Sequence, residues 1–448
     1  MYRRAGVAWA FISIVLVGCA AVEPIRGEDC AQWFATLDAT VDHAGVRDAG
    51  VYRTPGYPYF RLDRFLASFR KEILQNPPAF EAWVKRLRAL DARARSCELQ
   101  NLPPPLLRSL NIPDGRAAAA KVEVCAAELG RADLQSKSGR EALAARAAVP
   151  DEYSDLNRVL GLYPLATLPF SIGIDHWQAQ TVDGFRRAAA GETAAGPIAR
   201  YELPGRPLTA RGLTAIFARS NPDPLGIPRF SRDDREQLFE TFAPVFEIVT
   251  SGDFDRFGPL AWGAQPAPEV NVSHPTVYRR LAFTRYDRHV LTQLVYTVWF
   301  PERPRERSLD LVSGRLDGLV FRVTLDPQGH PLVYDTIHPC GCYHMFFPTA
   351  RVRVKPSPQP GLEWAFVPAT LPSVDPTWRI VWKSRAALTT SRVCALTRAA
   401  AALSIVSPKM TNCVPCRASA TQPAAPSDPT GSCQAPNAAS GCCSGRQA

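Results

Sequence analysis

The sequence predicts an α+β protein: a helical N-terminal region, a mainly antiparallel β-rich region and a disordered C-terminal tail. Three observations support this prediction. Apolar residues recur at helical spacing early in the chain, the period changes to two from about residue 270, and aromatic residues disappear after Trp382. We therefore divide the chain into a signal peptide (1–18), a linker (19–27), a helical domain (28–150), a mixed helix and loop region (151–262), a β-rich domain (263–382) and a Cys-rich tail (383–448).

The first residues have the pattern of a secretory signal. Arg3 and Arg4 precede an apolar run that is too short to span the ~30 Å of hydrocarbon in a bilayer. Leu16-Val17-Gly18-Cys19 resembles the bacterial lipobox, in which the chain is cut before an acylated cysteine. The resemblance implies that Cys19 carries three acyl chains, enough for stable membrane anchoring. The alternative is an ordinary signal peptide with an incidental cysteine.

The expected location of the protein and the distribution of its charge together limit which partners it can bind. Ala20 follows the cysteine where an Asp would favour the inner membrane, so we expect an outer-membrane lipoprotein that faces the periplasm. The net charge of +10 is concentrated at the two ends of the chain: the signal carries +2 and residues 383–448 carry +6. The body is nearly neutral and lacks the positive surface that binds nucleic acid, so nucleic acid is excluded as a partner. The membrane is the expected partner, with a protein or small molecule still to be identified.

The N-terminal region should contain several helices. One apolar face is formed by Leu62, Phe65, Leu66, Phe69 and Ile73. A second stripe runs from Phe80 to Leu90 and should end at the sequence NLPPPLL, and a third helix is expected from about Arg116 to Leu129.

Three cysteines lie on these apolar stripes: Cys30, Cys97 and Cys125. In an oxidising periplasm two of them could form a disulfide between helices, which would stabilise the fold by ~2–4 kcal/mol. The alternative is that all three are small buried apolar residues. The sequence alone does not select the pair.

The middle of the chain mixes loops and short helices. The stretch GLYPLATLPFSIGIDHW is predicted as loop and strand, and Ser231 is expected to cap a helix whose first turn is acidic. Asp175 and His176 beside Trp177 could supply a base next to an aromatic ring, although such a pair is more often structural.

The β-rich domain shows a long strand and a hairpin. HVLTQLVYTVWF, residues 289–300, is apolar on both faces and is expected to be a central strand. LVFRVTL and PLVYDTIH flank Asp326-Pro327-Gln328-Gly329, which has the residues that a type I turn favours.

The main candidate site is the segment HPCGCYH. If the strand alternation continues, His338, Cys340, Cys342 and His344 share one face, and all four are good ligands for zinc or copper. On a straight strand the outer pair would be ~20 Å apart, so one ion could not reach all four. A metal site would therefore use a subset, with a further ligand such as His274, His289 or Asp335.

Two other interpretations of this segment remain open. Cys340 and Cys342 could form a strained, easily reduced disulfide with a catalytic role. Alternatively, the segment is a structural corner whose histidines are hydrogen-bonded. Haem attachment is excluded because the spacing is C-x-C-x-H, and the chain contains no hydrolase elbow, P-loop or dinucleotide motif.

The tail after Trp382 carries six cysteines and a single acidic residue. Such a composition cannot form a core and predicts disorder. Cys413 and Cys416 form a C-x-x-C without a second half-site, which argues against a zinc or redox site there. A slipped reading frame would give a similar change in composition.

Four segments resemble a family of proteobacterial lipoproteins: PGYPYFRLDRFLASF, LVYTVWFPERP, LDGLVFRVTL and DTIHPCGCYHMFFP. The resemblance covers most of residues 28–370. It implies a cell-envelope location and carries over no activity and no site residue except Cys19. We therefore expect either an envelope protein that binds a partner or ligand, or a metal- or thiol-dependent periplasmic enzyme centred on HPCGCYH.

Overall fold

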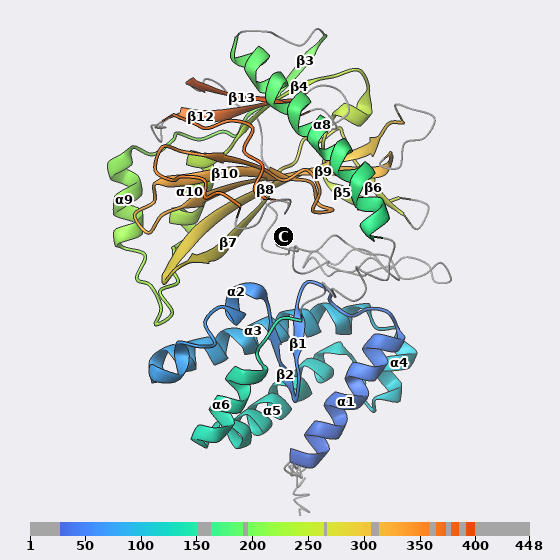
Figure 1. Ribbon diagram of the computed structural model, residues 1–448. Helices are drawn as coiled ribbons and strands as arrows, with labels where there is room; N and C mark the ends of the chain where they lie inside the picture. The colour runs from blue at the N-terminus through green and yellow to red at the C-terminus, as the bar shows by residue number, and fades with distance from the viewer. Residues whose placement is uncertain are drawn as a thin grey trace, which may run out of the picture.

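The structure is a computed structural model that describes residues 27–150, 163–190, 196–263, 267–305, 313–357, 364–372, 378–384 and 391–398. Cys19, the signal peptide and Cys413 and Cys416 of the tail lie outside the described residues. The described chain forms a helical part and a β-rich part, stacked one on the other (Figure 1). The predicted α+β class is confirmed.

The described helical part consists of nine elements in chain order. They are α1 (Gly27–His43), β1 (Tyr52–Thr54), β2 (Tyr57–Leu62), α2 (Arg64–Ala67), the 3₁₀ helix η1 (Ile73–Gln75), α3 (Pro77–Asn101), α4 (Pro104–Ser109) and α5 (Gly115–Leu134), with α6 (Lys137–Arg146) after them. The side chains of Asn76 and Asp114 cap α3 and α5 by accepting a backbone N–H. The second and third predicted helices are therefore confirmed.

The first predicted helix is wrong as a continuous element. β2 ends at Leu62, and the Asp63 side chain accepts the N–H of Leu66 to start the short α2. The apolar residues of the predicted helical face instead lie along a strand, a short helix and η1. All of them pack into one core. Apolar spacing alone cannot separate these cases, because Asp63 stops the strand and starts a new helix.

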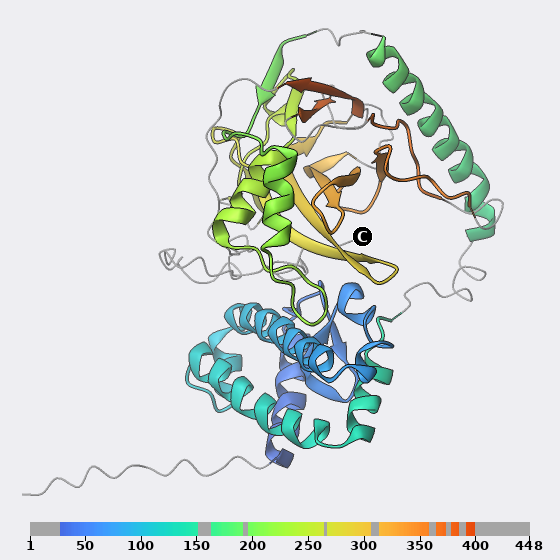
Figure 2. The ribbon, with the colours of Figure 1, turned by 90° about the vertical axis from the view of Figure 1, so that its left-hand side faces the viewer.

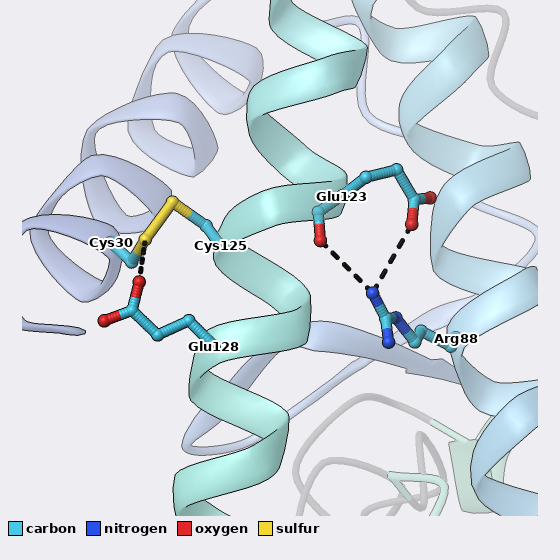
Figure 3. Close-up of a disulfide and its surroundings, with 5 residues drawn as sticks. All are labelled: Cys30, Arg88, Glu123, Cys125 and Glu128. Atoms are coloured by element: carbon cyan, nitrogen blue, oxygen red, sulfur yellow. Dashed lines mark hydrogen bonds and ion pairs between the residues drawn. A yellow bond between two sulfur atoms is a disulfide. The ribbon is translucent and has the colours of Figure 1, made fainter. Parts of the chain in front are cut away.

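A disulfide joins α1 to α5. Cys30 and Cys125 are fully buried and bonded to one another (Figure 3), so the predicted inter-helix disulfide is confirmed and its pair is identified. Cys97 also takes part in a disulfide. The Glu128 carboxylate lies 3.7 Å from the Cys30 sulfur, which has no proton to donate in the disulfide.

Charged side chains are buried where α3 meets β2. Arg61 donates to Glu98 at 2.8 Å and to Asp91 at 3.1 Å, and Arg95 donates to Asp91 at 3.0 Å. All four side chains are nearly inaccessible to water. Each charge is paired in this cluster, and breaking such a buried pair by removing one partner is strongly destabilising.

The β-rich part begins with the long helix α8 (Tyr163–Ala189). It continues with β3 (Ile198–Tyr201), α9 (Ala210–Ala218), α10 (Arg232–Phe242), β4 (Val245–Val249), η2 (Asp253–Asp255), β5 (Leu260–Trp262), β6 (Pro268–Val270), β7 (Tyr278–Tyr286), β8 (His289–Arg303), β9 (Gly314–Leu325), β10 (Pro331–Ile337), β11 (Met345–Pro348), β12 (Trp378–Ser384) and β13 (Ser391–Arg398).

Two sheets share one core. The first is antiparallel with the strand order β11-β10-β9-β8-β7, and the second has the order β13-β12-β4-β3, in which β12 and β4 are parallel. Phe246 and Trp382 from the second sheet meet Leu294, Tyr296 and Phe321 from the first. β8 has neighbours on both sides, so the predicted central strand is confirmed, as is the β9–β10 hairpin.

Two expectations about the β-rich part need correction. The stretch predicted as loop and strand forms α8, in which Pro164 lies in the first turn and Phe185 anchors the helix on Phe347. The paired strand β13 also extends the folded part beyond residue 382, where the tail was expected to begin. Ser231, by contrast, caps α10 as expected, accepting the N–H of Asp234.

The two parts make direct contact. Leu225, Ile227 and Val290 join the core of the helical part, and Arg86 of α3 pairs with Asp223 at 2.5 Å. None of the helices in the part of the chain that the structure describes is long and apolar enough to span a bilayer.

Candidate functional site

The segment HPCGCYH forms the turn between β10 and β11. The N–H of His338 donates to the Cys342 carbonyl at 3.1 Å, and the N–H of Gly341 donates to the His338 carbonyl at 2.8 Å. Gly341 has a φ of +90°, which glycine adopts without strain. This is a three-residue hairpin loop with a left-handed third position. The chain therefore reverses at the two cysteines, and the predicted continuous alternation is wrong.

The preceding hairpin uses the same loop. The N–H of Gly329 donates to the Asp326 carbonyl at 3.0 Å, the N–H of Asp326 donates to the His330 carbonyl, and Gly329 also has a φ of +90°. In both loops proline is followed two residues later by glycine. That shared pattern is the signal that could have predicted the second turn.

His338 is buried at the base of the turn. Its Nδ1 lies 3.5 Å from Asp317 Oδ1, and its ring contacts the ring of Tyr343. Burial lowers the pKa of His338; Asp317 opposes this shift, and the positive charge of Arg303 adds to it. His338 is therefore a neutral, packed residue near neutral pH.

His344 immediately precedes the returning strand β11 and faces a different carboxylate. Its Nε2 is 3.1 Å from Asp335 Oδ1. Arg322 donates to the same carboxylate through Nε at 3.0 Å and Nη2 at 2.7 Å, since β9 and β10 pair Arg322 directly with Asp335. This cluster also fixes β11, because the His344 ring stacks on Phe346.

The two cysteines differ from the histidines in being exposed. Neither Cys340 nor Cys342 takes part in a disulfide. The N–H of Cys342 donates to Cys340 Sγ at 3.4 Å, so the two residues lie side by side at the tip. A Cβ built on Gly341, between them, would meet no atom within 4 Å. The tip is therefore open to a reacting molecule.

The structure divides the four predicted metal ligands into two kinds. The histidines face separate carboxylates, and the cysteines lie at the turn. Within the described ranges no group of three or more His, Cys, Asp or Glu side chains is placed to hold a metal ion. Of the suggested extra ligands, Asp335 is engaged by Arg322, His274 contacts Ser273, and His289 is exposed at the start of β8.

The aromatic residues around the turn come from distant segments. Trp177 of α8 lies 5.1 Å from Tyr343 and 5.1 Å from Phe366, measured between ring centroids. His176 contacts Gln180 on α8, so the structure does not bring His176 and Asp175 together as a pair. Asp317 and Arg322 were missed as site residues because their roles depend on strand register, and Tyr343 was missed because its role depends on how α8 packs.

Comparison with known proteins assigns the sequence to no family. No protein-family model and no curated protein matches the sequence. Two solved structures are similar, one described as "Toxin fold for microbial attack and plant defense" and the other as "NLPPya in complex with mannosamine". Both are 15% identical; they cover 39% and 38% of this chain and 74% and 72% of their own, with TM-scores of 0.23 and 0.22. Scores this low establish no shared fold, and we infer no activity from them.

Proposed function

We propose that the protein is a lipid-anchored envelope protein whose working site is the pair of thiols of Cys340 and Cys342, and that this pair exchanges with disulfides. One observation carries the proposal. The three cysteines of the helical part are in disulfides, whereas these two are exposed, adjacent and outside any disulfide. In an oxidising compartment such thiols are the reactive ones.

The reaction needs only these two sulfurs and a partner disulfide. One thiolate attacks a sulfur of the partner disulfide, forming a mixed disulfide and releasing the first partner thiolate, which takes up a proton. The other tip thiolate then attacks the mixed disulfide and releases the second partner thiol. The partner disulfide is reduced by two electrons, and Cys340 and Cys342 are oxidised to a disulfide. The reverse reaction donates a disulfide to a dithiol.

The flanking histidines are better suited to holding the turn than to proton transfer. His338 is buried against Asp317 and Tyr343, and His344 is paired with Asp335. Each histidine ties one arm of the turn to the sheet, which leaves the tip itself projecting and accessible. This arrangement supports thiol chemistry more than a histidine-based hydrolase.

Exchange is tested by adding oxidised glutathione to the selectively reduced full chain. The expected product is an internal Cys340–Cys342 disulfide, found by mass spectrometry of the tip peptide. The single variants Cys340→Ser and Cys342→Ser each lack one of the two thiols. The variant that keeps the attacking thiol should accumulate a mixed disulfide with glutathione, because no second thiol is present to resolve it. Unreacted tip thiols in the parent chain, under conditions that oxidise free cysteine, would overturn the proposal.

The anchor is proposed from the lipobox at Cys19. Labelled palmitate should join the mature chain and the protein should partition into the detergent phase, while Cys19→Ala should do neither. A parent chain that stays in the aqueous phase and carries no label would contradict the anchor without affecting the exchange test.

A second candidate function is binding of a thiophilic metal ion. Two adjacent thiolates suit Cu(I), whereas a structural zinc site needs four ligands and would require residues beyond those described at the tip. Metal analysis of the purified chain would then find copper that is lost in Cys340→Ser/Cys342→Ser. Equal metal content in the two proteins would exclude this candidate.

A further inference from the structure

Beside the thiol pair, the helix α8 leaves an apolar segment uncovered. Figure 2 shows α8 along the outer side of the β-rich part. Ile172 is 68% exposed and Ile174 is 37% exposed. A Cβ built on Gly173, between them, meets no atom within 4 Å. An exposed apolar side chain marks a binding surface only where it belongs to a contiguous patch, so its neighbours decide its meaning.

Of these two isoleucines, only Ile174 lies on the side of α8 that meets the turn. Ile174 lies one helical turn before Trp177 and shares its face, since residues three apart are neighbours on a helix. The Trp177 ring contacts Tyr343, and Tyr343 directly follows Cys342. Ile174, Trp177 and Tyr343 therefore form a row that starts on α8 and ends at the residue next to Cys342. Ile172 points away, roughly 140° from Trp177 at 100° per residue.

The charge of α8 selects among partners. From Tyr163 to Phe185 the helix contains Asp175 and Asp183 and no Lys or Arg. An anionic lipid surface attracts basic residues and repels such a segment, so a bilayer is a poor partner for it. An apolar stretch of polypeptide is a good one, because aromatic and aliphatic side chains give contact area at low entropic cost.

We propose that Ile174, Trp177 and Tyr343 form a docking surface for an apolar stretch of a polypeptide whose cysteines react with Cys340 and Cys342. The proposal rests on the proposed exchange function and names its substrate class. An unfolded chain exposes apolar side chains and cysteines together, whereas a folded protein buries them. The substrate is therefore an unfolded polypeptide, and small disulfides react without using α8.

The test compares two matched variants with two substrates. Ile174→Gln removes an apolar side chain from the docking surface, and Ile172→Gln makes the same change on the opposite side of the same helix. Each full chain is reduced at the tip and mixed either with a denatured polypeptide that contains one disulfide or with 5,5′-dithiobis(2-nitrobenzoate). We expect Ile174→Gln to lower the second-order rate constant for the polypeptide about threefold to tenfold. Its rate with the small disulfide, and both rates of Ile172→Gln, should equal those of the parent.

The outcomes separate the two proposals. If the rate constant for the polypeptide is unchanged in Ile174→Gln, or falls equally in both variants, the docking surface is wrong while exchange stands. If the parent reacts with neither substrate, the exchange function itself is wrong. Both exposed variants should keep the parent's thermal unfolding temperature, since neither side chain belongs to a core.

Discussion

At the scale of single residues, burial separates the histidines of the turn from its cysteines. His338 and His344 each have a carboxylate partner, and His338 is only 6% exposed. Cys340 and Cys342 have the opposite environment, since both are exposed at the tip. The turn thus combines a buried lower part, which holds the histidines, with an exposed tip, which holds the cysteines, and the two can be tested separately.

The buried histidine predicts a dependence of stability on pH. Burial holds the folded pKa of His338 below the ordinary value of about 6.5, so the unfolded chain takes up this proton at a higher pH than the folded chain does. The free energy of unfolding should therefore fall as the pH is lowered through about 6.5 and should be fully restored above it. Urea denaturation between pH 5 and about pH 8 measures this slope.

The control is His338→Gln, which cannot take up the proton. In this variant the free energy of unfolding should no longer show the part of its fall below about pH 6.5 that comes from His338. The pH dependence that comes from other groups should be unchanged. Parallel pH profiles for the parent chain and the variant would mean that the environment of His338 is not as described.

At the scale of elements, the turn rests on β9 because Gly318 has no side chain. A Cβ there would lie 2.8 Å from Pro339 Cγ and 3.1 Å from Trp299 Cε3. Gly341 differs, since its surroundings are open and only its φ of +90° disfavours a side chain. The two glycines therefore serve different purposes, close packing and backbone conformation.

Alanine at these two positions should give different results. Gly341→Ala should cost about 1 kcal/mol through backbone strain and leave the position of the turn unchanged. Gly318→Ala should cost about 1–3 kcal/mol through overpacking and should alter the reaction rate of the tip thiols. Denaturation curves and thiol titration measure both effects, and equal behaviour of the two variants would contradict the packing of Pro339 on β9.

The disulfide between α1 and α5 should contribute strongly to stability. It closes a loop of 95 residues, and removing it in Cys30→Ala/Cys125→Ala should lower the free energy of unfolding by about 2–5 kcal/mol. The matched control is Cys340→Ser/Cys342→Ser, which should change it by less than about 0.5 kcal/mol because both residues are exposed. A similar loss in both double variants would show that the tip also stabilises the fold.

At the scale of the whole molecule, a few polar contacts couple the helical part to the β-rich part. Asp223 is central, because its Oδ1 accepts the N–H groups of Leu225 and Ile227 while its Oδ2 accepts from Arg86 of α3. Arg285 of β7 adds a bond to the Ser68 carbonyl, and its guanidinium lies over the Phe69 ring. The two parts should therefore unfold together.

The substitution Asp223→Asn tests this coupling. Asn keeps an acceptor for the loop N–H groups and loses the charge on the Arg86 contact, so we expect a loss of about 1–2 kcal/mol and a broader unfolding transition. Arg88→Gln is the control, because the Arg88–Glu123 pair is exposed and lies within the helical part (Figure 3). Arg88→Gln should lower the free energy of unfolding by only about 0–0.5 kcal/mol. A sharp, unshifted transition in Asp223→Asn would show that the parts are held together mainly by apolar contacts.

Much of this architecture could be predicted from local sequence patterns. The long run of residues 289–300 that is apolar on both faces, the turn at Asp326 and the cap of α10 at Ser231 are all local signals, and each is confirmed. Helix α8 was missed because two prolines and a glycine interrupt an apolar run without clear periodicity. The pairing of β12 with β4 joins segments far apart in the chain, and no local pattern encodes it.

The candidate site could be predicted only in part. The sequence identified the right heptad, but its Pro-x-Gly turn signal was outweighed by the alternation of His and Cys. The partners Asp317 and Arg322 depend on the register of β9 against β10, and Trp177 depends on how α8 packs. These are consequences of tertiary structure, which propensities and spacing do not contain.

The reduction potential of the Cys340–Cys342 pair decides whether these two thiols can exchange with disulfides. It can be measured by differential alkylation of the full chain in glutathione buffers. A disulfide between residues only two apart is strained and here would be exposed, so we expect a potential above about −200 mV, in the range of exchanging pairs. A value below about −300 mV, typical of structural disulfides, or thiols that form no disulfide in any buffer, would contradict the account.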